Sequence, residues 1–422
     1  MYSVKVIKML LFEPVNCYIC LNMSQNESQI SVIDGLNNLS YQERNRDPGT
    51  SLKNAEKAME LSEKIKYKKG KADALNNIGF YHVQITEHDK SLNYLLEALD
   101  LQEEINNEVG IANTHYNLAV LQIRYANFTL ALDYLQKCMP FREKLKDSAG
   151  LALCYFQSAY INDIFKHDDE AMECIRNGLE IREKLNDRIG IAALYNLWAK
   201  VCIRQNKFDE AREIIDKALN LRSPQDEIRG YFASAFTKVE LEIKCGNLEA
   251  AKKLGIEGFE IASAHKEWFG VMRYNMAIGK IALLENNCDK AKKYFLETLK
   301  IAEERKFQSI RYEVYELLSD MYLKVGDYAE ALNFYKKFHL LKEEVLNAQS
   351  SSRLKSVQLM NQIESSKREA ELERVKNVDL KNAFKEIEEK NKEILDSIKY
   401  ASRIQKALLP QEIYIERYFT NS

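Results

Sequence analysis

The sequence predicts an all-α protein, in which a superhelical solenoid of stacked helix pairs is followed by one long helix. Three observations lead to this prediction. The 422 residues include only 15 Gly and 5 Pro, which are too few breakers for a fold of many short strands. Six glycines recur at intervals of 40 residues, and residues 341–409 contain neither Gly nor Pro.

Composition and charge narrow the classes of partner. The chain is 46% hydrophobic and 29% charged, which is ordinary for a folded domain. Its 61 basic and 63 acidic residues give a formal charge of −2, so no global field attracts nucleic acid or an anionic membrane. We therefore expect neither nucleic acid nor membrane as a partner, and recognition by local surfaces instead.

Residues 1–26 are expected to be a poorly ordered N-terminus, with Met23 as an alternative start to Met1. The apolar run near the start is interrupted by Glu13 and Pro14, so it does not form a signal peptide. The eight cysteines lie mostly among apolar neighbours, as reduced buried thiols do. These features indicate a cytoplasmic protein.

The sequence offers no catalytic, metal or cofactor site. Cys17 and Cys20 form a single C-x-x-C without a second pair, and we interpret this spacing as chance. The six histidines are isolated, and none lies in a zinc-binding motif. Phosphate-binding glycine loops and a G-x-S-x-G elbow are also missing from the sequence.

Residues 27–70 are predicted to form a degenerate capping hairpin. Its first helix would run near residues 27–45, and the turn Asp47-Pro48-Gly49 would lead into the second. Ser51 and Ala58 occupy positions that are small in the later repeats. A solenoid needs such an atypical terminal unit to cover its end.

A 40-residue period organises residues 71–350 into seven repeats. Its marks are Gly70, Gly110, Gly150, Gly190, Gly230 and Gly270, with Ile310 at the seventh. Small residues recur 9, 21 and 28 positions beyond the marks, as at Ala119, Ala131 and Cys138 in the second repeat, with Val239 and Phe338 as the exceptions. Such a pattern predicts two helices that cross closely and touch the next pair at the same points.

This pattern resembles the tetratricopeptide repeat, whose signature places small residues at its eighth, twentieth and twenty-seventh positions. The familiar repeat has about 34 residues, so the extra six imply longer helices, as in extended tetratricopeptide repeats of bacterial sensors. HEAT and armadillo arrays have a similar period, but they would not keep this register of small residues. The resemblance implies that the first helix of each repeat lines a concave groove.

The groove positions carry carboxamides and aromatic residues first and basic residues later. We predict that a peptide or protein partner binds there, because a carboxamide can both donate to and accept from an extended backbone. The alternative is that these polar groups face solvent or bridge adjacent helices. The candidate residues are Asn76, Asn77, Phe80, Tyr116, Asn117, Arg124, Phe156, Gln157, Tyr160, Asn196, Lys200 and Arg204, followed by Lys244, Arg273 and Lys280.

Residues 351–410 are predicted to form a coiled-coil stalk. Apolar residues alternate by four and three along its second half, as in a left-handed coiled coil. The seam consists of Leu380, Phe384, Ile387, Asn391, Ile394, Ile398 and Ala401. A narrow apolar stripe and an Asn at one a position favour a parallel homodimer. The alternative is a single helix that folds back on the solenoid.

The segment SIKYASRIQKALLP, residues 397–410, resembles the start of the catalytic region in bacterial stage II sporulation protein E-like serine/threonine phosphatases of the metal-dependent type. Ser397, Ile398, Tyr400, Ala401, Arg403, Ile404, Gln405, Ala407, Leu409 and Pro410 match. The resemblance implies that metal-binding aspartates would follow, so residues 411–422 would begin a phosphatase-like domain that the chain lacks. A natural truncation and a fragment both remain open, and this chain is expected not to be an enzyme.

Together these features predict a bacterial signalling module. The solenoid would bind a peptide or protein, and the dimeric stalk would transmit the change to a phosphatase domain. A scaffold that only assembles other proteins is the alternative. A third possibility is an inactive competitor that forms heterodimers with a full-length phosphatase.

Overall fold

The computed structural model describes residues 13–225 and 227–408, with side chains for 27–225 and 227–407. This described part contains sixteen helices and no strand, which confirms the predicted all-α solenoid. The chain divides into one unit that ends at Ser356 and a second that begins at Val357. The side chains of Cys17 and Cys20, residues 1–12 and residues 409–422 lie outside the described part.

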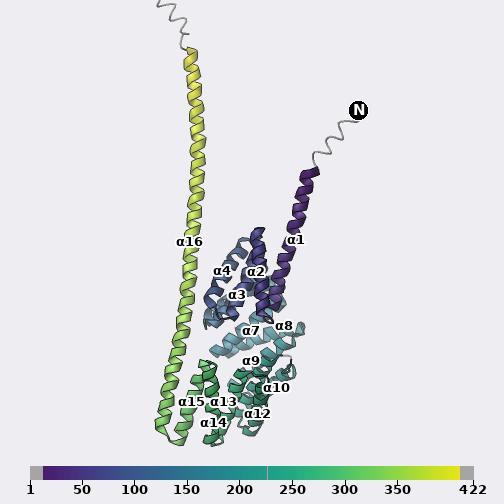
Figure 1. Cartoon of the computed structure of the whole chain (residues 1–422), viewed down its shortest axis with the longest axis vertical. Helices are drawn as coiled ribbons and strands as arrows, with labels where there is room; N and C mark the ends of the chain where they lie inside the picture. The colour runs from purple at the N-terminus through teal and green to yellow at the C-terminus, as the bar shows by residue number, and fades with distance from the viewer. Residues whose placement is uncertain (1–12, 226, 409–422) are drawn as a thin grey trace, which may run out of the picture. The chain divides into compact units, whose positions relative to one another are not determined.

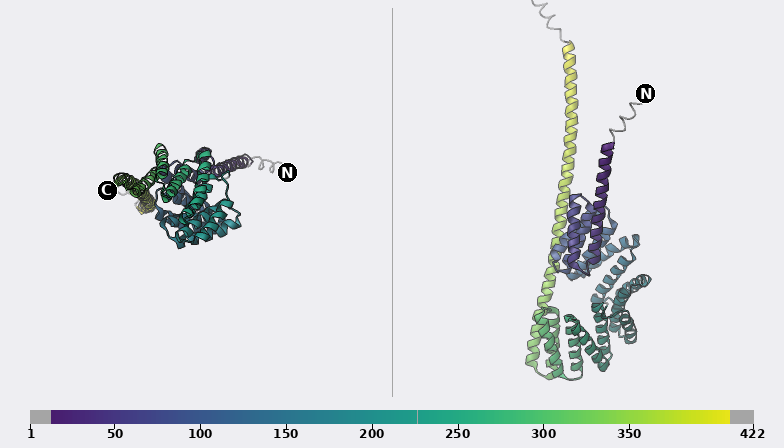
Figure 2. Two further views of the ribbon diagram at one scale, coloured as in Figure 1. Left: turned by 90° about the horizontal axis from the view of Figure 1, so that it is seen from below. Right: turned by 45° about the vertical axis from the view of Figure 1, so that its right-hand side comes forward.

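The first unit consists of helix pairs that stack in chain order (Figures 1 and 2). The N-terminal pair is α1 (Glu13–Glu43) and α2 (Pro48–Lys64), so α1 begins before the expected 27–45 helix. The repeats are α3 (Lys68–Gln84) with α4 (His88–Glu104), α5 (Glu108–Arg124) with α6 (Phe128–Lys144), α7 (Ser148–Phe165) with α8 (Asp168–Lys184), α9 (Arg188–Arg204) with α10 (Phe208–Asn220), α11 (Ile228–Lys244) with α12 (Leu248–Ala264), α13 (Trp268–Leu284) with α14 (Cys288–Glu304), and α15 (Gln308–Val325) with the beginning of α16 (Tyr328–Leu408).

Short turns with one left-handed residue set the period of the array. Most of these helices have 17 residues and are separated by three. In the turn after α2, Tyr67 N–H donates to Ser62 O at 2.8 Å and Lys66 N–H donates to Glu63 O at 3.3 Å. Lys66 has φ 56°. This pair of bonds satisfies the last carbonyls of the helix, and two such helix-plus-turn units give the 40-residue spacing.

The glycine marks lie at the third residue of each first helix, where space is restricted. Gly150 N–H donates to the Asp147 carboxylate at 2.9 Å, and Asp147 therefore caps α7. A Cβ at Gly150 would lie 2.8 Å from Arg142 Cδ of the preceding helix. Glycine therefore recurs because a side chain from the previous repeat occupies that place.

The small positions are close crossings between helices, as the repeat pattern predicts. A Cβ at Gly79 in α3 would lie 2.7 Å from Leu95 Cγ in α4, within the same pair. A Cβ at Gly178 in α8 would lie 2.9 Å from Leu194 Cδ1 in α9, which begins the next pair. These contacts fix the approach both within and between repeats.

Three consecutive repeats contain an arginine that is almost fully buried near the end of the second helix or in the turn after it. Each pairs with the carboxylate five residues later: Arg142 with Asp147, Arg182 with Asp187, and Arg222 with Glu227. Because a buried guanidinium is costly without a partner, these pairs hold the turn between consecutive repeats. The sequence analysis did not identify them.

The helix α16 has two environments along its length. Phe334, Phe338 and Leu341 pack in a core with Ile310 and Leu318 of α15, so the first turns complete the seventh repeat. No helix in the described residues has an apolar stretch that could cross a membrane.

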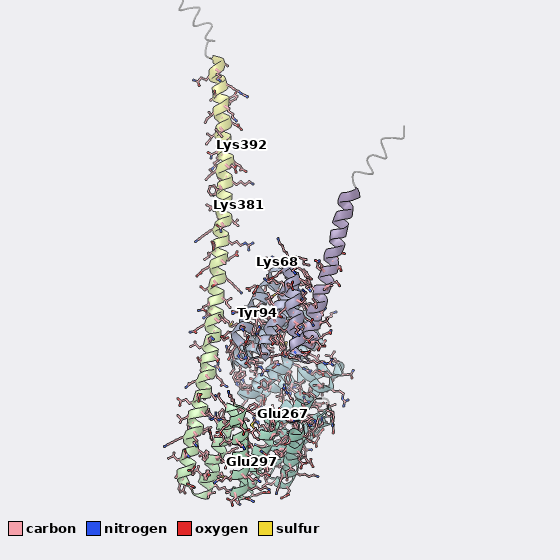
Figure 3. The ribbon with its side chains drawn as sticks, in the orientation of Figure 1. Lys68, Tyr94, Glu267, Glu297, Lys381 and Lys392 are labelled. Atoms are coloured by element: carbon pink, nitrogen blue, oxygen red, sulfur yellow. The ribbon has the colours of Figure 1, made fainter. Side chains whose placement is uncertain are left out.

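From residue 371 to 407 every residue of α16 is exposed, including Lys381 and Lys392, which are labelled in Figure 3. The predicted seam lies within this exposed part. Phe384 is 65% exposed and Ile394 is 56% exposed.

The crossing at Gly279 gives a test of the packing. An added Cβ would overlap the fully buried Phe295 ring, so Gly279→Ala should lower the free energy of unfolding by about 1–3 kcal/mol. Gly35 in α1 has nothing within 4 Å of the corresponding position, so Gly35→Ala should raise it by about 0.5–1 kcal/mol. Urea unfolding followed by circular dichroism measures both changes, and equal effects would contradict the assigned crossing.

His115 gives a pH-dependent test. It is buried beside Tyr134, and burial is the main reason that the pKa of its imidazole falls to about 4, with a smaller contribution from Lys137. The unfolded chain binds this proton near pH 6.5, so the folded state loses relative stability as the pH falls from about 6.5 to 4. His115→Phe should remove on the order of 2–3 kcal/mol of this loss. Thermal unfolding at pH 7 and pH 4.5 measures it, and an unchanged pH dependence would contradict the assignment.

Candidate functional site

A cavity of about 920 Å³ lies on the inner side of the repeat array. Its lining comes from the first helices α5, α9, α11 and α13, with Glu267 and Phe307 from the turns before α13 and α15. Because α5 and α13 belong to repeats that are not adjacent, the cavity lies across the hollow of the superhelix. We refer to it as the inner pocket.

Aromatic residues form one side of the inner pocket. The rings of Phe232 and Phe236 meet the Tyr274 ring edge-on, with centroids 6.0 and 5.9 Å away. Tyr274 is 1% exposed, and burial raises the pKa of its hydroxyl, which therefore stays neutral. Phe269 is by contrast well exposed. This arrangement leaves apolar surface for a ligand side chain.

Four basic residues surround the aromatic side: Arg124, Lys200, Arg229 and Arg273. Arg273 Nη1 lies 2.9 Å from Glu313 Oε2, and its guanidinium carbon lies 5.4 Å from the Phe269 ring centroid. Among the described residues the other three make no ion pair. Four basic residues thus share the pocket lining with two acidic ones, and three of the four basic residues lack an ion pair in the described structure.

The inner pocket also contains two acidic residues. The Glu267 carboxylate accepts from Gly270 N–H at the start of α13, whereas Glu240 lies on α11. The Glu240 side chain is exposed to solvent, but the other residues of the pocket surround it, and desolvation raises the pKa of its carboxyl. Lys200, Arg273 and Lys280 oppose this shift. Glu240 can accept a hydrogen bond from a ligand, while the excess of basic groups keeps the pocket suited to an anion.

The predicted carboxamides near the start of the array lie between neighbouring first helices. Asn117 Nδ2 donates to Asn76 Oδ1 at 2.9 Å, and Thr114 Oγ1 donates to the same oxygen at 3.1 Å. Asn77 Nδ2 donates to Asn37 O at 3.1 Å. These bonds join α1, α3 and α5, so their polar groups bridge adjacent helices.

The remaining predicted residues of the middle repeats have mixed environments. Gln157 Nε2 donates to the Tyr116 hydroxyl at 3.4 Å, and burial raises the pKa of that tyrosine. Phe156 packs against the core of the third and fourth repeats, whereas Tyr160 is partly exposed. Asn196 is buried, and its amide oxygen has no partner in the described structure.

Two more predicted residues are held by contacts inside the protein. Phe80 lies under the Arg44 guanidinium, with the carbon 4.5 Å from the ring centroid. Arg204 pairs with Asp163 at 2.5 Å and Asp168 at 2.6 Å. Neither residue lines the inner pocket, while Lys244 and Lys280 are exposed elsewhere on the first helices.

The structure brings Arg124, Lys200 and Arg273 together from the predicted set. It adds Phe232, Phe236, Phe269, Arg229 and Glu240, which the sequence analysis did not include as site residues. The repeat register could have predicted two of these residues. Phe236 and Glu240 lie 6 and 10 positions beyond Gly230. Asn196 and Lys200, which were predicted as site residues, lie at the same two positions in the preceding repeat.

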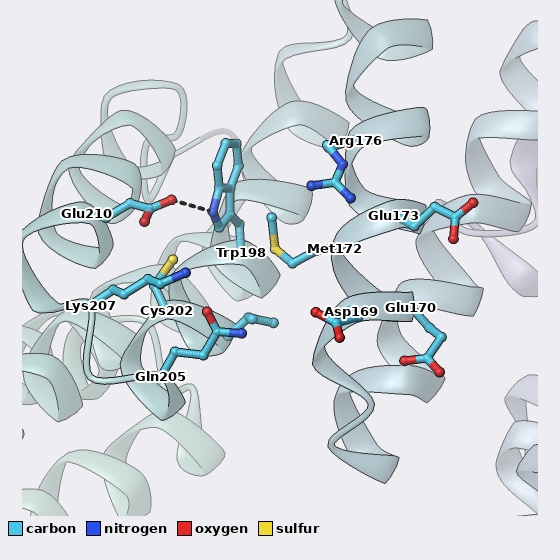
Figure 4. Close-up of a pocket in the computed structure, with 11 residues that line it drawn as sticks. Asp169, Glu170, Met172, Glu173, Arg176, Trp198, Cys202, Gln205, Lys207 and Glu210 are labelled. Carbon is cyan, nitrogen blue, oxygen red and sulfur yellow. Dashed lines mark hydrogen bonds between the residues drawn. The ribbon is translucent and has the colours of Figure 1, made fainter.

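A second cavity of about 700 Å³ lies among α8, α9 and α10 (Figure 4). Acidic side chains from α8 stand opposite Trp198, whose indole N–H donates to Glu210 Oε1 at 3.1 Å. Lys207 and Arg176 balance part of this charge. In the part of the chain with described side chains, no group of three His, Cys, Asp or Glu could hold a metal ion. We take the inner pocket as the candidate site because it combines unpaired charge with exposed aromatic surface.

Comparison with protein families identifies the repeats. Residues 71–144 and residues 312–342 match family models described as tetratricopeptide repeats. These two segments are the first two repeats and the last, so the helix pairs between them continue the same architecture. A sequence search of curated proteins gives no match.

Solved structures of tetratricopeptide proteins share the fold. The apo form of RapI is 14% identical, with a TM-score of 0.56, and the match covers 64% of this chain and 96% of that one. The apo quorum sensor NprR from B. thuringiensis is 16% identical, with a TM-score of 0.56 and coverage of 80% and 99%. A Rap conjugation gene regulator of plasmid pLS20, in complex with the Phr* peptide, is 15% identical, with a TM-score of 0.51 and coverage of 75% and 96%.

Proposed function

We propose that this chain is a regulatory binding module whose inner pocket recognises a short peptide with a carboxylate beside a large apolar side chain. The observation that carries the proposal is the set of basic groups without an ion pair next to the exposed Phe269 ring and the half-buried Phe236 ring. Lys200 and Arg229 would bind the carboxylate through charge-assisted hydrogen bonds. Phe236 and Phe269 would contact the apolar side chain.

Size and architecture support a peptide ligand. A cavity of about 920 Å³ is at the upper end of the usual range for small ligand sites, and its lining spans first helices from four repeats, a span that suits an extended chain. The similar Rap regulator is in complex with the Phr* peptide. At 15% identity this likeness concerns the fold, so the ligand is proposed from the pocket's own chemistry.

Binding of a hexapeptide library, measured by fluorescence anisotropy, tests the pocket. We expect the selected peptides to carry an acidic group or a free C-terminal carboxylate near a Phe, Leu or Tyr. The double variant Lys200→Glu/Arg229→Glu should weaken the selected peptide at least about tenfold, because each lost charge-assisted bond contributes about 1.5–3 kcal/mol. Phe236→Ala should weaken peptides with aromatic side chains more than those with small ones.

The matched control is Lys253→Glu, which reverses an exposed charge on α12 outside the inner pocket. It should leave the affinity unchanged. If the control and the pocket variants lose affinity equally, net charge rather than the pocket governs binding. Selection of peptides without any acidic group would count against the proposal.

We further propose that the exposed helix pairs with a second copy of the chain through its seam. The support is the heptad spacing of large apolar residues that the described structure leaves uncovered, including Leu380, Ile387 and Ile398. Burial of such residues in a two-stranded coil is favourable, and paired Asn391 side chains would select parallel register.

Sedimentation of the full chain tests this pairing. Ile394→Asp places a carboxylate in the seam and should shift the mass from dimer to monomer. Lys392→Asp introduces the same group two residues earlier, outside the seam, and should leave the dimer intact. A wild-type chain that stays monomeric at micromolar concentration would contradict the pairing.

The output of the module is proposed from residues 397–410 alone, which resemble the entry to a serine/threonine phosphatase region. In this view the helix transmits the state of the groove to such a domain. Fusion of a related phosphatase region, assayed with and without the repeats, tests the transmission. Equal turnover would favour the alternative, a scaffold that assembles proteins without regulating an enzyme.

A further inference from the structure

The last residues of the first unit return to the beginning of the repeat array. Ser356 Oγ lies 3.3 Å from Gln122 Nε2 and 3.4 Å from Gln122 Oε1, which joins α16 to α5. Arg353 Nη2 donates to Ala126 O at 2.7 Å, in the turn after α5. Lys355 forms an ion pair with Asp89 in α4. We name these three contacts the clasp.

The clasp is a specific contact with a buried centre. Gln122 and Ser356 are both 0% exposed. Among the described side chains from 342 to 407, Ser356 alone is buried. Burial of a hydroxyl and a carboxamide is costly unless each has a hydrogen-bond partner. The Ser356 hydroxyl and the Gln122 carboxamide are within hydrogen-bonding distance of each other.

Asp89, the partner of Lys355, is oriented by a tyrosine of the following repeat. The Tyr125 hydroxyl donates to Asp89 Oδ1 at 3.0 Å, and His88 meets the Tyr125 ring edge-on at 5.0 Å. The hydrogen bond from Lys355 is the main reason that the pKa of Asp89 is lowered. The acceptor is therefore ionised and positioned at neutral pH.

The clasp adjoins the inner pocket through the end of α5. Arg124, which lines the pocket, lies in the chain between Gln122 and Ala126, which both contact α16. On the far side of the pocket Arg273 belongs to the sixth repeat. The pocket in its described form therefore requires the second repeat to face the sixth, and the clasp joins the first and second repeats to residues 353–356, which follow the seventh.

We propose that the clasp closes the repeat array around the inner pocket and that a ligand bound to Arg124 and the α11–α13 side stabilises this closed state. The ligand in this proposal is the peptide of the proposed function. The closure of the array by the clasp does not depend on that function. A ligand that bridges the second and sixth repeats favours the spacing at which residues 353–356 reach α5. Binding and closure then stabilise each other.

Hydrogen exchange of the full chain without ligand tests the closure. Lys355→Glu places like charges together at Asp89 and should speed amide exchange in residues 118–130 and 345–360 about fivefold, as expected for loss of about 1 kcal/mol. The charge-swapped Asp89→Lys/Lys355→Glu chain should recover most of the protection. Lys376→Glu, an exposed reversal on the same helix, is the matched control and should change neither segment.

A steric variant separates the clasp from charge effects. Ser356→Trp cannot fit the buried site beside Gln122 and should speed exchange in both segments, whereas Ser356→Ala should have a smaller effect. Unchanged exchange in Lys355→Glu and Ser356→Trp, or a swap that restores nothing, would overturn the closure.

The ligand arm uses the hexapeptide selected from the library. It should slow exchange in residues 345–360 of the wild-type chain and bind Ser356→Trp about fivefold more weakly, a loss of about 1 kcal/mol. A hexapeptide that binds without changing this exchange would refute the coupling while leaving the peptide site intact. If no hexapeptide binds, the peptide function fails, and the ligand-free variants still decide the closure.

Discussion

Close contact between helices at positions without room for a larger side chain is the constraint on which the array depends. Gly79 and Gly279 set the approach within pairs, while Gly178 and Gly258 set it between them. Because the same positions recur at a fixed interval, each pair joins the next at nearly the same angle. The accumulated rotation turns the first helices toward a common hollow, where α5 can face α11 and α13.

Buried ion pairs occupy two of the junctions between these closely packed repeats. Where Arg142 and Arg182 leave the second helices, each meets the aspartate that caps the following first helix. One carboxylate therefore satisfies a helix terminus and a buried guanidinium together. In the first repeats, carboxamides such as Asn76 perform a related task between first helices. Arg124, Lys200 and Arg229 of the inner pocket make no ion pair in the described structure.

Much of the fold could be predicted from the sequence, because the repeat positions are selected by space. The glycine marks and the small residues identified the helix pairs without further information. The left-handed turn residues were less visible, since Lys66 and Asn106 occupy positions that favour glycine; bonds at the helix end set that conformation. For the site, the register identified Arg124 and Lys200. Their meeting with Phe236 depends on superhelical winding, which no single repeat encodes.

The helix α16 packs into the array at its beginning and is exposed at its end. Phe334, Phe338 and Leu341 recur at i, i+4 and i+7 and bury one face against α15. Beyond the clasp, the seam from Leu380 onward recurs by four and three, with large residues exposed. No Gly or Pro interrupts the sequence between these two parts, so no helix breaker separates the buried turns from the exposed ones and α16 continues through both.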